Sequence, residues 1–232
     1  MADESRVRAN VRTPLKFVGL GEVLFDVFED GTATLGGAPL NVAVHAHQLA
    51  SALGVGEGIV VSRVGRDPLG SQISHALTER GMSTRYLQMD PVHSTGTVSV
   101  FMLDGEPGYQ IESDAAWDFL EHEANLDGLA ASCDAVCFGS LAQRGLVSQG
   151  AIRCFLQKAS GALRLYDMNL RRNTLTHETG YSAEVIEESC HLATTMKLNE
   201  IELSELCELY GIACSAGSGE GMIRKRIEGV LT

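Results

Sequence analysis

The sequence has 232 residues, of which 44% are hydrophobic and 21% charged, as in an ordinary globular protein with one substantial core. Its formal net charge of −12 repels the phosphates of nucleic acids and anionic lipids, so neither a nucleic acid nor a membrane is expected as a partner. A nucleotide is not excluded, because a few donors and a metal ion neutralise phosphates locally.

The cysteines and the N-terminal residues indicate a reducing compartment. The six cysteines form no Cys-x-x-Cys pair, and Cys133 and Cys137 lie in or beside an apolar run where thiols behave as small hydrophobic groups. Residues 1–13 lack the apolar core of a signal peptide, and no stretch reaches the apolar length of a membrane span. We therefore expect a cytoplasmic protein with reduced thiols.

Short apolar runs typical of strands alternate along the chain with longer helical patterns. The strands are expected at 17–20, 23–28, 58–64, 135–138, 163–166 and 195–198, and the helices at 38–53, 68–80, 145–159, 182–190 and 200–210. This alternation predicts the α/β fold class, with a mostly parallel sheet and helices on both of its faces.

Two segments depart from this alternation. Residues 95–111 alternate apolar and polar side chains around Asp104-Gly-Glu-Pro107, and residues 25–35 contain a Glu29-Asp-Gly31 turn. Both patterns are typical of antiparallel hairpins with one face in water. We expect them to form a small β lid over the edge of the sheet, although two ordinary surface hairpins would fit the pattern equally well.

A glycine pair precedes the first predicted helix, in Leu35-Gly-Gly-Ala-Pro-Leu-Asn41. Gly36 and Gly37 permit backbone conformations closed to other residues and a close approach of a ligand. Pro39 suits a first helical turn, in which Asn41 could offer a donor and an acceptor to a hydroxylated ligand. Alone, this stretch could equally be a plain turn before a helix.

Two carboxylates lie near the end of the first predicted strand. Gly19-Leu-Gly-Glu22 and Asp26 lie at the point where ligands gather in open α/β sheets, and a carboxylate there could accept hydrogen bonds from sugar hydroxyls. Asp26 could equally be a turn residue, and Glu22 a solvated side chain.

Five stretches follow one another along the chain: Gly36-Gly-Ala-Pro-Leu-Asn41, Arg63-Val-Gly-Arg-Asp-Pro-Leu-Gly70, Ser113-Asp-Ala-Ala-Trp-Asp-Phe119, Asp167-Met-Asn-Leu-Arg171 and Lys197-Leu-Asn-Glu-Ile-Glu202. In this order they resemble the ribokinase-like (phosphofructokinase-B type) carbohydrate kinases, with fructokinases the most similar. The resemblance runs from Phe17 to about Tyr210.

The resemblance implies roles for individual residues. The substrate-binding residues would be Asp26, Gly36, Gly37, Asn41 and Arg171, with Arg171 near the sugar or the transferred phosphate. Asn199 and Glu202 would order phosphate and magnesium, with Glu202 reaching the metal through water. These two residues also fit a plain capping box at a helix start, and both roles could hold together.

The activity implied is ATP-dependent phosphorylation of a small sugar with Mg2+. Fructose is favoured, and 2-keto-3-deoxygluconate, ribose and a nucleoside are the rivals. The resemblance also implies a homodimer that pairs through the lid.

One family element has no counterpart in the sequence. Members carry a Gly-Ala-Gly-Asp element that contains the catalytic base, and Ala216-Gly-Ser-Gly219 shares only its small residues. We therefore assign no catalytic residue, and we expect residues 1–232 to form a ribokinase-like domain without its C-terminal third. Such a chain would be a fragment, a truncated product, one of two partner chains, or a non-catalytic sugar-binding or regulatory protein.

Overall fold

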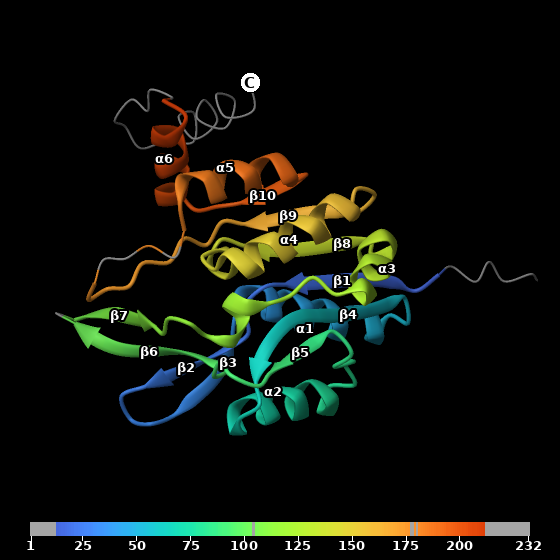
Figure 1. The fold of residues 1–232 in the computed structure, drawn as a ribbon, viewed down its shortest axis with the longest axis horizontal. Coiled ribbons are helices and arrows are strands. Elements are labelled where there is room, and N and C mark those ends of the chain that lie inside the picture. Colours follow the sequence, from blue (N-terminus) through green and yellow to red (C-terminus); the bar gives the residue numbers. More distant parts are fainter. Residues whose placement is uncertain (1–12, 104, 177–178, 180, 212–232) are drawn as a thin grey trace, which may run out of the picture.

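The computed structural model describes residues 13–103, 105–176, 179 and 181–211. Its centre is a six-stranded sheet in which every pair of neighbouring strands is parallel (Figure 1). The strands are β1 (Leu15–Leu20), β4 (Gly56–Gly65), β5 (Leu87–Asp90), β8 (Ala135–Gly139), β9 (Leu163–Asp167) and β10 (Thr195–Lys197). The predicted mostly parallel α/β fold is confirmed.

The strand order reverses beside β1. The sheet runs β10-β9-β8-β1-β4-β5, so the chain extends from β1 toward β4 and β5 and then returns to build β8, β9 and β10 on the other side. In open α/β sheets such a reversal leaves a crevice beyond the carboxyl ends of the two strands concerned. Here the crevice is expected beyond β1 and β8.

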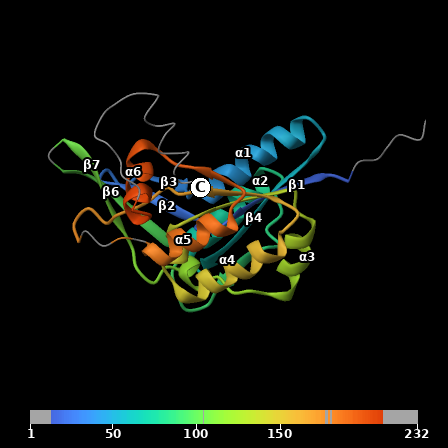
Figure 2. The same cartoon turned by 90° about the horizontal axis from the view of Figure 1, so that it is seen from above.

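Helices cover both faces of this sheet (Figure 2). On one face α1 (Ala38–Ala52) and α2 (Pro68–Glu79) pack on a core that includes Val60 and Val64 of β4. On the other, α3 (Ala124–Ser132), α4 (Leu146–Lys158) and α5 (Ala183–Leu192) pack on a core that includes Ile59 and Val61. Burial on both sides accounts for the continuous apolar run Ile59-Val-Val61 in the middle of β4. A last described helix, α6 (Glu200–Leu209), follows β10.

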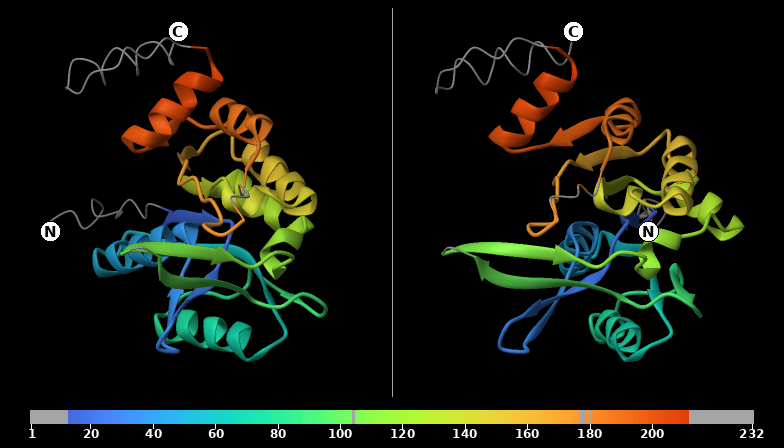
Figure 3. Two further views of the ribbon diagram at one scale, coloured as in Figure 1. Left: turned by 90° about the vertical axis from the view of Figure 1, so that its left-hand side faces the viewer. Right: turned by 60° about the vertical axis from the view of Figure 1, so that its left-hand side comes forward.

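The two predicted hairpins join in one small sheet. It consists of β3 (Ala33–Gly36), β2 (Leu24–Phe28), β6 (Gly96–Leu103) and β7 (Glu106–Ile111), in that order. The pairs β2–β3 and β6–β7 are antiparallel, whereas β2 and β6 run parallel. Figure 3 shows this sheet lying apart from the six-stranded one, as expected for a lid rather than for two unconnected hairpins. Two single turns of 3-10 helix complete the fold, at Ala116–Phe119 and Leu141–Gln143.

Strand β5 and helix α3 were not predicted from the sequence. The thiols of Cys133 and Cys137 are buried, as expected. Among the residues that the structure describes, no helix is long and apolar enough to cross a membrane. The stretch Ala216–Gly219 lies outside the described residues.

Candidate functional site

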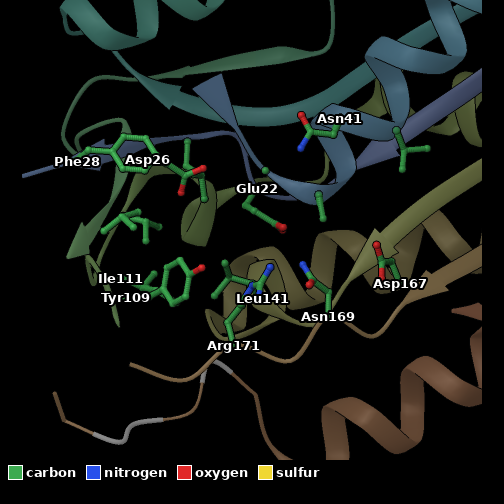
Figure 4. Close-up of a pocket in the computed structure, with 16 residues that line it drawn as sticks. Glu22, Asp26, Phe28, Asn41, Tyr109, Ile111, Leu141, Asp167, Asn169 and Arg171 are labelled. Carbon is green, nitrogen blue, oxygen red and sulfur yellow. The ribbon is translucent and has the colours of Figure 1, made fainter. Parts of the chain in front are cut away.

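A cavity of about 470 Å³ lies where the carboxyl ends of β1 and β9 and the turn after β8 meet the first turn of α1 and the lid (Figure 4). It therefore occupies the crevice that the strand order predicts. Its polar lining comes from Glu22, Asp26, Gly37, Asn41, Asp167, Asn169 and Arg171. Its apolar lining includes Leu24, Phe28, Val98, Val100, Tyr109, Ile111 and Leu141.

The glycine pair brings α1 close to the loop after β1. Gly37 is the N-cap of α1 and has φ 115°, a conformation that favours glycine, and a Cβ there would lie 2.5 Å from the Glu22 carbonyl oxygen. The Asn41 N–H donates to the Gly37 carbonyl oxygen at 3.0 Å, which closes the first turn. Asn41 thereby lies on the cavity wall.

Gly36 lies behind Asp26 rather than in the cavity lining. A Cβ at Gly36 would lie 2.6 Å from Asp26 Oδ2, so glycine leaves room for that carboxylate in the neighbouring strand β2. Partial burial raises the pKa of Asp26, and the positive charge of Arg171 partly offsets this effect. The Asp26 carboxyl group lines the cavity.

The chain after β9 contributes a second polar wall. Asp167 ends β9 and accepts a hydrogen bond from Lys197 Nζ at 2.8 Å. Asn169 has φ 38°, and this left-handed turn precedes Arg171 on the same wall. The Arg171 guanidinium carbon lies 5.9 Å from the centre of the Tyr109 ring, which joins this wall to the lid. Asp26, Asn41 and Arg171 therefore face one cavity.

Arg172, the neighbour of Arg171, does not line this cavity. Its guanidinium forms an ion pair with Glu205 of α6 at 3.0 Å and also bonds the Tyr181 hydroxyl at 3.3 Å. The two adjacent arginines therefore have different environments.

Asn199 and Glu202 lie outside the cavity and build the start of α6. The Asn199 side chain caps the helix, and Glu202 Oε2 accepts the Asn199 N–H at 2.9 Å, so the capping box is present. Glu202 Oε1 accepts the Leu170 N–H at 3.0 Å, which ties α6 to the segment that carries Arg171. The sequence pattern admitted both a structural and a metal-ordering role, and these contacts account for the structural one.

The same residues allow only an indirect metal site. Among the described residues, no group of three or more His, Cys, Asp or Glu side chains could hold an ion. Both Glu202 oxygens already accept a backbone N–H, but each carboxylate oxygen can accept a second hydrogen bond, for example from a metal-bound water. The donor set thus fits a magnesium ion held through water, as Mg2+ commonly is.

Glu22 was not assigned a site role from the sequence. Its side chain is 2% exposed, and its Oε2 has no hydrogen-bond partner. Burial raises the pKa of Glu22 to about 7, although hydrogen bonds from the backbone N–H groups of Glu22 and Ala38 act to lower it. The negative charge of Asp167 also raises this pKa. The suggestion of a solvated side chain is wrong because α1 packs over this loop. The preceding Gly21 has φ 143°, so the turn that leads into this buried position favours glycine.

The Ser113–Phe119 segment does not line this cavity, and its part Ala115–Asp118 is buried in the core. Trp117 is fully buried, and a Cβ at Gly96 would overlap its ring. Asp118 forms an ion pair with Arg144 at 2.8 Å, and Arg144 also lies over the Trp117 ring. The Trp117 ring therefore packs against the start of β6.

A parallel α/β sheet with a polar cavity at its strand reversal, covered by a β lid, defines the class of small-molecule-binding α/β proteins. The model of the pfkB family carbohydrate kinases matches residues 22–219, and the chain belongs to this family.

The relatives agree with this assignment. The chain is 29% identical over 196 residues to a sugar kinase of Pyrococcus horikoshii, which covers 79% of this chain and 61% of that one. It is 29% identical over 199 residues to a fructokinase of Vibrio alginolyticus, with 83% and 63% covered. The chain thus spans about three fifths of the length of these curated relatives.

Solved structures have the same fold. The crystal structure of the Pyrococcus horikoshii sugar kinase has a TM-score of 0.70 and 27% identity, covering 86% of this chain and 67% of that chain. The structure of a fructokinase from Vibrio cholerae has a TM-score of 0.71 and 24% identity, covering 94% and 71%.

Proposed function

We propose that this chain forms the sugar-binding part of an ATP-dependent sugar kinase, with fructose as the favoured substrate. The observation that carries this proposal is the convergence of Asp26, Asn41 and Arg171 on one cavity from three separate segments. Gly37 contributes by its position at the start of α1, and Gly36 by leaving room for Asp26.

The chemistry of the cavity suits a small polyol. Carboxylates accept hydrogen bonds from hydroxyl groups, and Asn41 can both donate and accept. The volume of about 470 Å³ is within the range of small-molecule pockets, and the apolar side chains of the lid offer a surface to the carbon face of a sugar ring. Arg171 adds the one guanidinium in this lining, which suits a phosphate oxygen near the sugar.

ATP is proposed as the phosphate donor because relatives bind adenine nucleotides. The Pyrococcus horikoshii sugar kinase has been solved in complex with ATP, and the Vibrio cholerae fructokinase with fructose, ADP and a calcium ion. Magnesium would neutralise charge on the phosphates, and Asn199 and Glu202 would hold it through water at the start of α6. We propose a cytoplasmic location for the same enzyme.

Support for fructose over its rivals comes from the Asp167–Arg171 corner and from the fructokinases among the relatives. The Ala115–Asp118 part of the resemblance adds nothing to substrate choice, because that segment lies in the core. The rivals remain 2-keto-3-deoxygluconate, ribose and a nucleoside.

Calorimetry with fructose and its rivals tests the sugar site, and Asn41→Ala is the informative variant. We expect fructose to bind the native chain, and we expect Asn41→Ala to weaken binding about tenfold, as for the loss of one or two hydrogen bonds. The exposed Asn125→Ala is the matched control. If no sugar binds, the proposal is wrong.

A second candidate is a non-catalytic sugar-binding or regulatory protein on the same fold. It would bind its sugar in the same cavity, through Asp26, Asn41 and Arg171. An assay of ATP-dependent fructose phosphorylation distinguishes the two, since sugar binding without turnover supports the second candidate and turnover supports the kinase.

A further inference from the structure

Glu22 is a buried acid in the cavity lining, and one of its carboxyl oxygens has no hydrogen-bond partner. It lies in the loop between β1 and β2, lines the cavity and is 2% exposed. In Figure 4 its carboxyl group lies between the side chains of Asn41 and Asn169. Its Oε2 has no hydrogen-bond partner, which is costly for a buried carboxylate.

The groups near Glu22 supply no donor to Oε2. The backbone N–H groups of Glu22 and Ala38 bond the carboxyl group, yet Oε2 has no partner. Asp167 at the end of β9 carries a charge of the same sign, and the Cys137 thiol of β8 offers only a weak donor. Arg171 is the cation of this wall, but its guanidinium lies over Tyr109. Lys197 of β10 is bonded to Asp167. A ligand hydroxyl group in the cavity is therefore a suitable donor for Glu22.

We propose that Glu22 is a substrate-binding residue of this cavity: as a carboxylate it accepts a hydrogen bond from one hydroxyl group of the bound sugar, so that sugar binding releases a proton from Glu22 to solvent. This inference rests on the proposed sugar-binding function. It adds an acidic ligand that the family resemblance did not supply.

The direction of the pH dependence follows from this exchange. In the empty cavity burial raises the pKa of Glu22 to about 7, so near neutrality a large fraction is protonated. A hydroxyl donor stabilises the ionised form and lowers that pKa, because a hydrogen bond to a charged acceptor is stronger than one to a neutral acceptor. Sugar affinity must then rise with pH through about 7.

Calorimetry of fructose binding at pH 6 and pH 8 tests the inference on the full chain. We expect the native chain to bind about tenfold more tightly at pH 8, since one pH unit below a pKa costs about one factor of ten. Repeating the titration in buffers of different ionisation enthalpy should reveal proton release near neutral pH. This measurement requires no variant.

The isosteric variant Glu22→Gln separates binding from structure. At pH 8 the variant should bind fructose about tenfold more weakly than the native chain, and at pH 6 about equally. The affinity of the variant itself should not change between pH 6 and pH 8. Glu208→Gln, an exposed change on α6, should retain the native profile. A merely structural Glu22 would give a variant whose affinity loss is the same at both pH values.

The outcomes distinguish the two proposals. If the native chain binds fructose equally at both pH values without proton release, the role of Glu22 is wrong while the sugar site stands. If the native chain binds no sugar at either pH, the sugar site and the role of Glu22 are both wrong.

Discussion

Acidic side chains dominate the cavity at the scale of single residues. Glu22, Asp26 and Asp167 line a space that contains the guanidinium of Arg171, and Lys197 neutralises Asp167 from outside. The burial of Glu22 and Asp26 raises both pKa values. Such an arrangement costs folding free energy in the empty protein and is compensated only when donors enter the cavity.

Glu22→Gln should therefore stabilise the protein without its ligand. Burial raises the pKa of Glu22 to about 7 from 4.5, so the folded chain binds more protons than the unfolded chain between these values. The stabilising contribution of protonated Glu22 is therefore complete below pH 4.5 and is lost as the pH rises through 7. At pH 8 the variant should gain about 3 kcal/mol in urea unfolding. A variant that is less stable than the native chain at pH 8 would contradict this account.

Gly37→Ala tests the backbone at the start of α1. Alanine is strained at φ 115°, and its Cβ would lie 2.5 Å from the Glu22 carbonyl oxygen, so we expect a loss of about 2 kcal/mol and weaker sugar binding.

The control is Gly150→Ala in the middle of α4, where a Cβ meets nothing within 4 Å. Because alanine favours a helix, this change should stabilise the chain by about 0.5–1 kcal/mol. Similar unfolding midpoints for the two variants would show that the Gly37 turn is not constrained as described.

At the scale of elements, α6 and the chain after β9 form one unit. Glu202 accepts hydrogen bonds from the N–H groups of both Leu170 and Asn199. The helix start thus holds the segment that carries Arg171, so a residue outside the cavity supports one of its walls.

Glu202→Ala should loosen this unit. Two backbone donors lose a charged acceptor, so we expect a loss of about 2–3 kcal/mol and faster hydrogen exchange at Leu170 and in α6. Glu208→Ala, at an exposed position of the same helix, should change stability by less than about 0.5 kcal/mol. Unchanged exchange at Leu170 in Glu202→Ala would contradict the proposed support.

The lid carries apolar side chains that its own sheet does not cover. Met102 and Leu103 at the end of β6 are 60% and 44% exposed. We propose that a second copy of the chain covers them in a homodimer. Light scattering should then give twice the chain mass, and Met102→Glu should lower it toward one chain. A native chain that is monomeric at micromolar concentration would contradict the proposal.

At the scale of the whole molecule, periodicity predicted most of the fold. The main strands and helices were predictable because apolar runs in β4 and β8 are buried on both faces and the helices show regular apolar spacing. Two elements were missed because their signals are weak. Strand β5 has only four residues, and α3 contains Gly128 in a nine-residue helix.

The site was predictable in part. Asp26, Asn41 and Arg171 were identified through motif resemblance, and the strand reversal brings them together. The place of Glu22 in the cavity was not predicted, because the sequence of this loop does not show that helix α1 will bury it. The capping box of Asn199 and Glu202 was predictable, whereas the bond from the Leu170 N–H to Glu202 was visible only in three dimensions.

A crystal structure of the chain with fructose is the most direct test of the central claim. The account predicts one sugar molecule in the cavity beyond β1, with its hydroxyl groups within hydrogen-bond distance of Asp26, Asn41 and Arg171. Fructose bound elsewhere, with this cavity holding only water at saturating sugar, would contradict it.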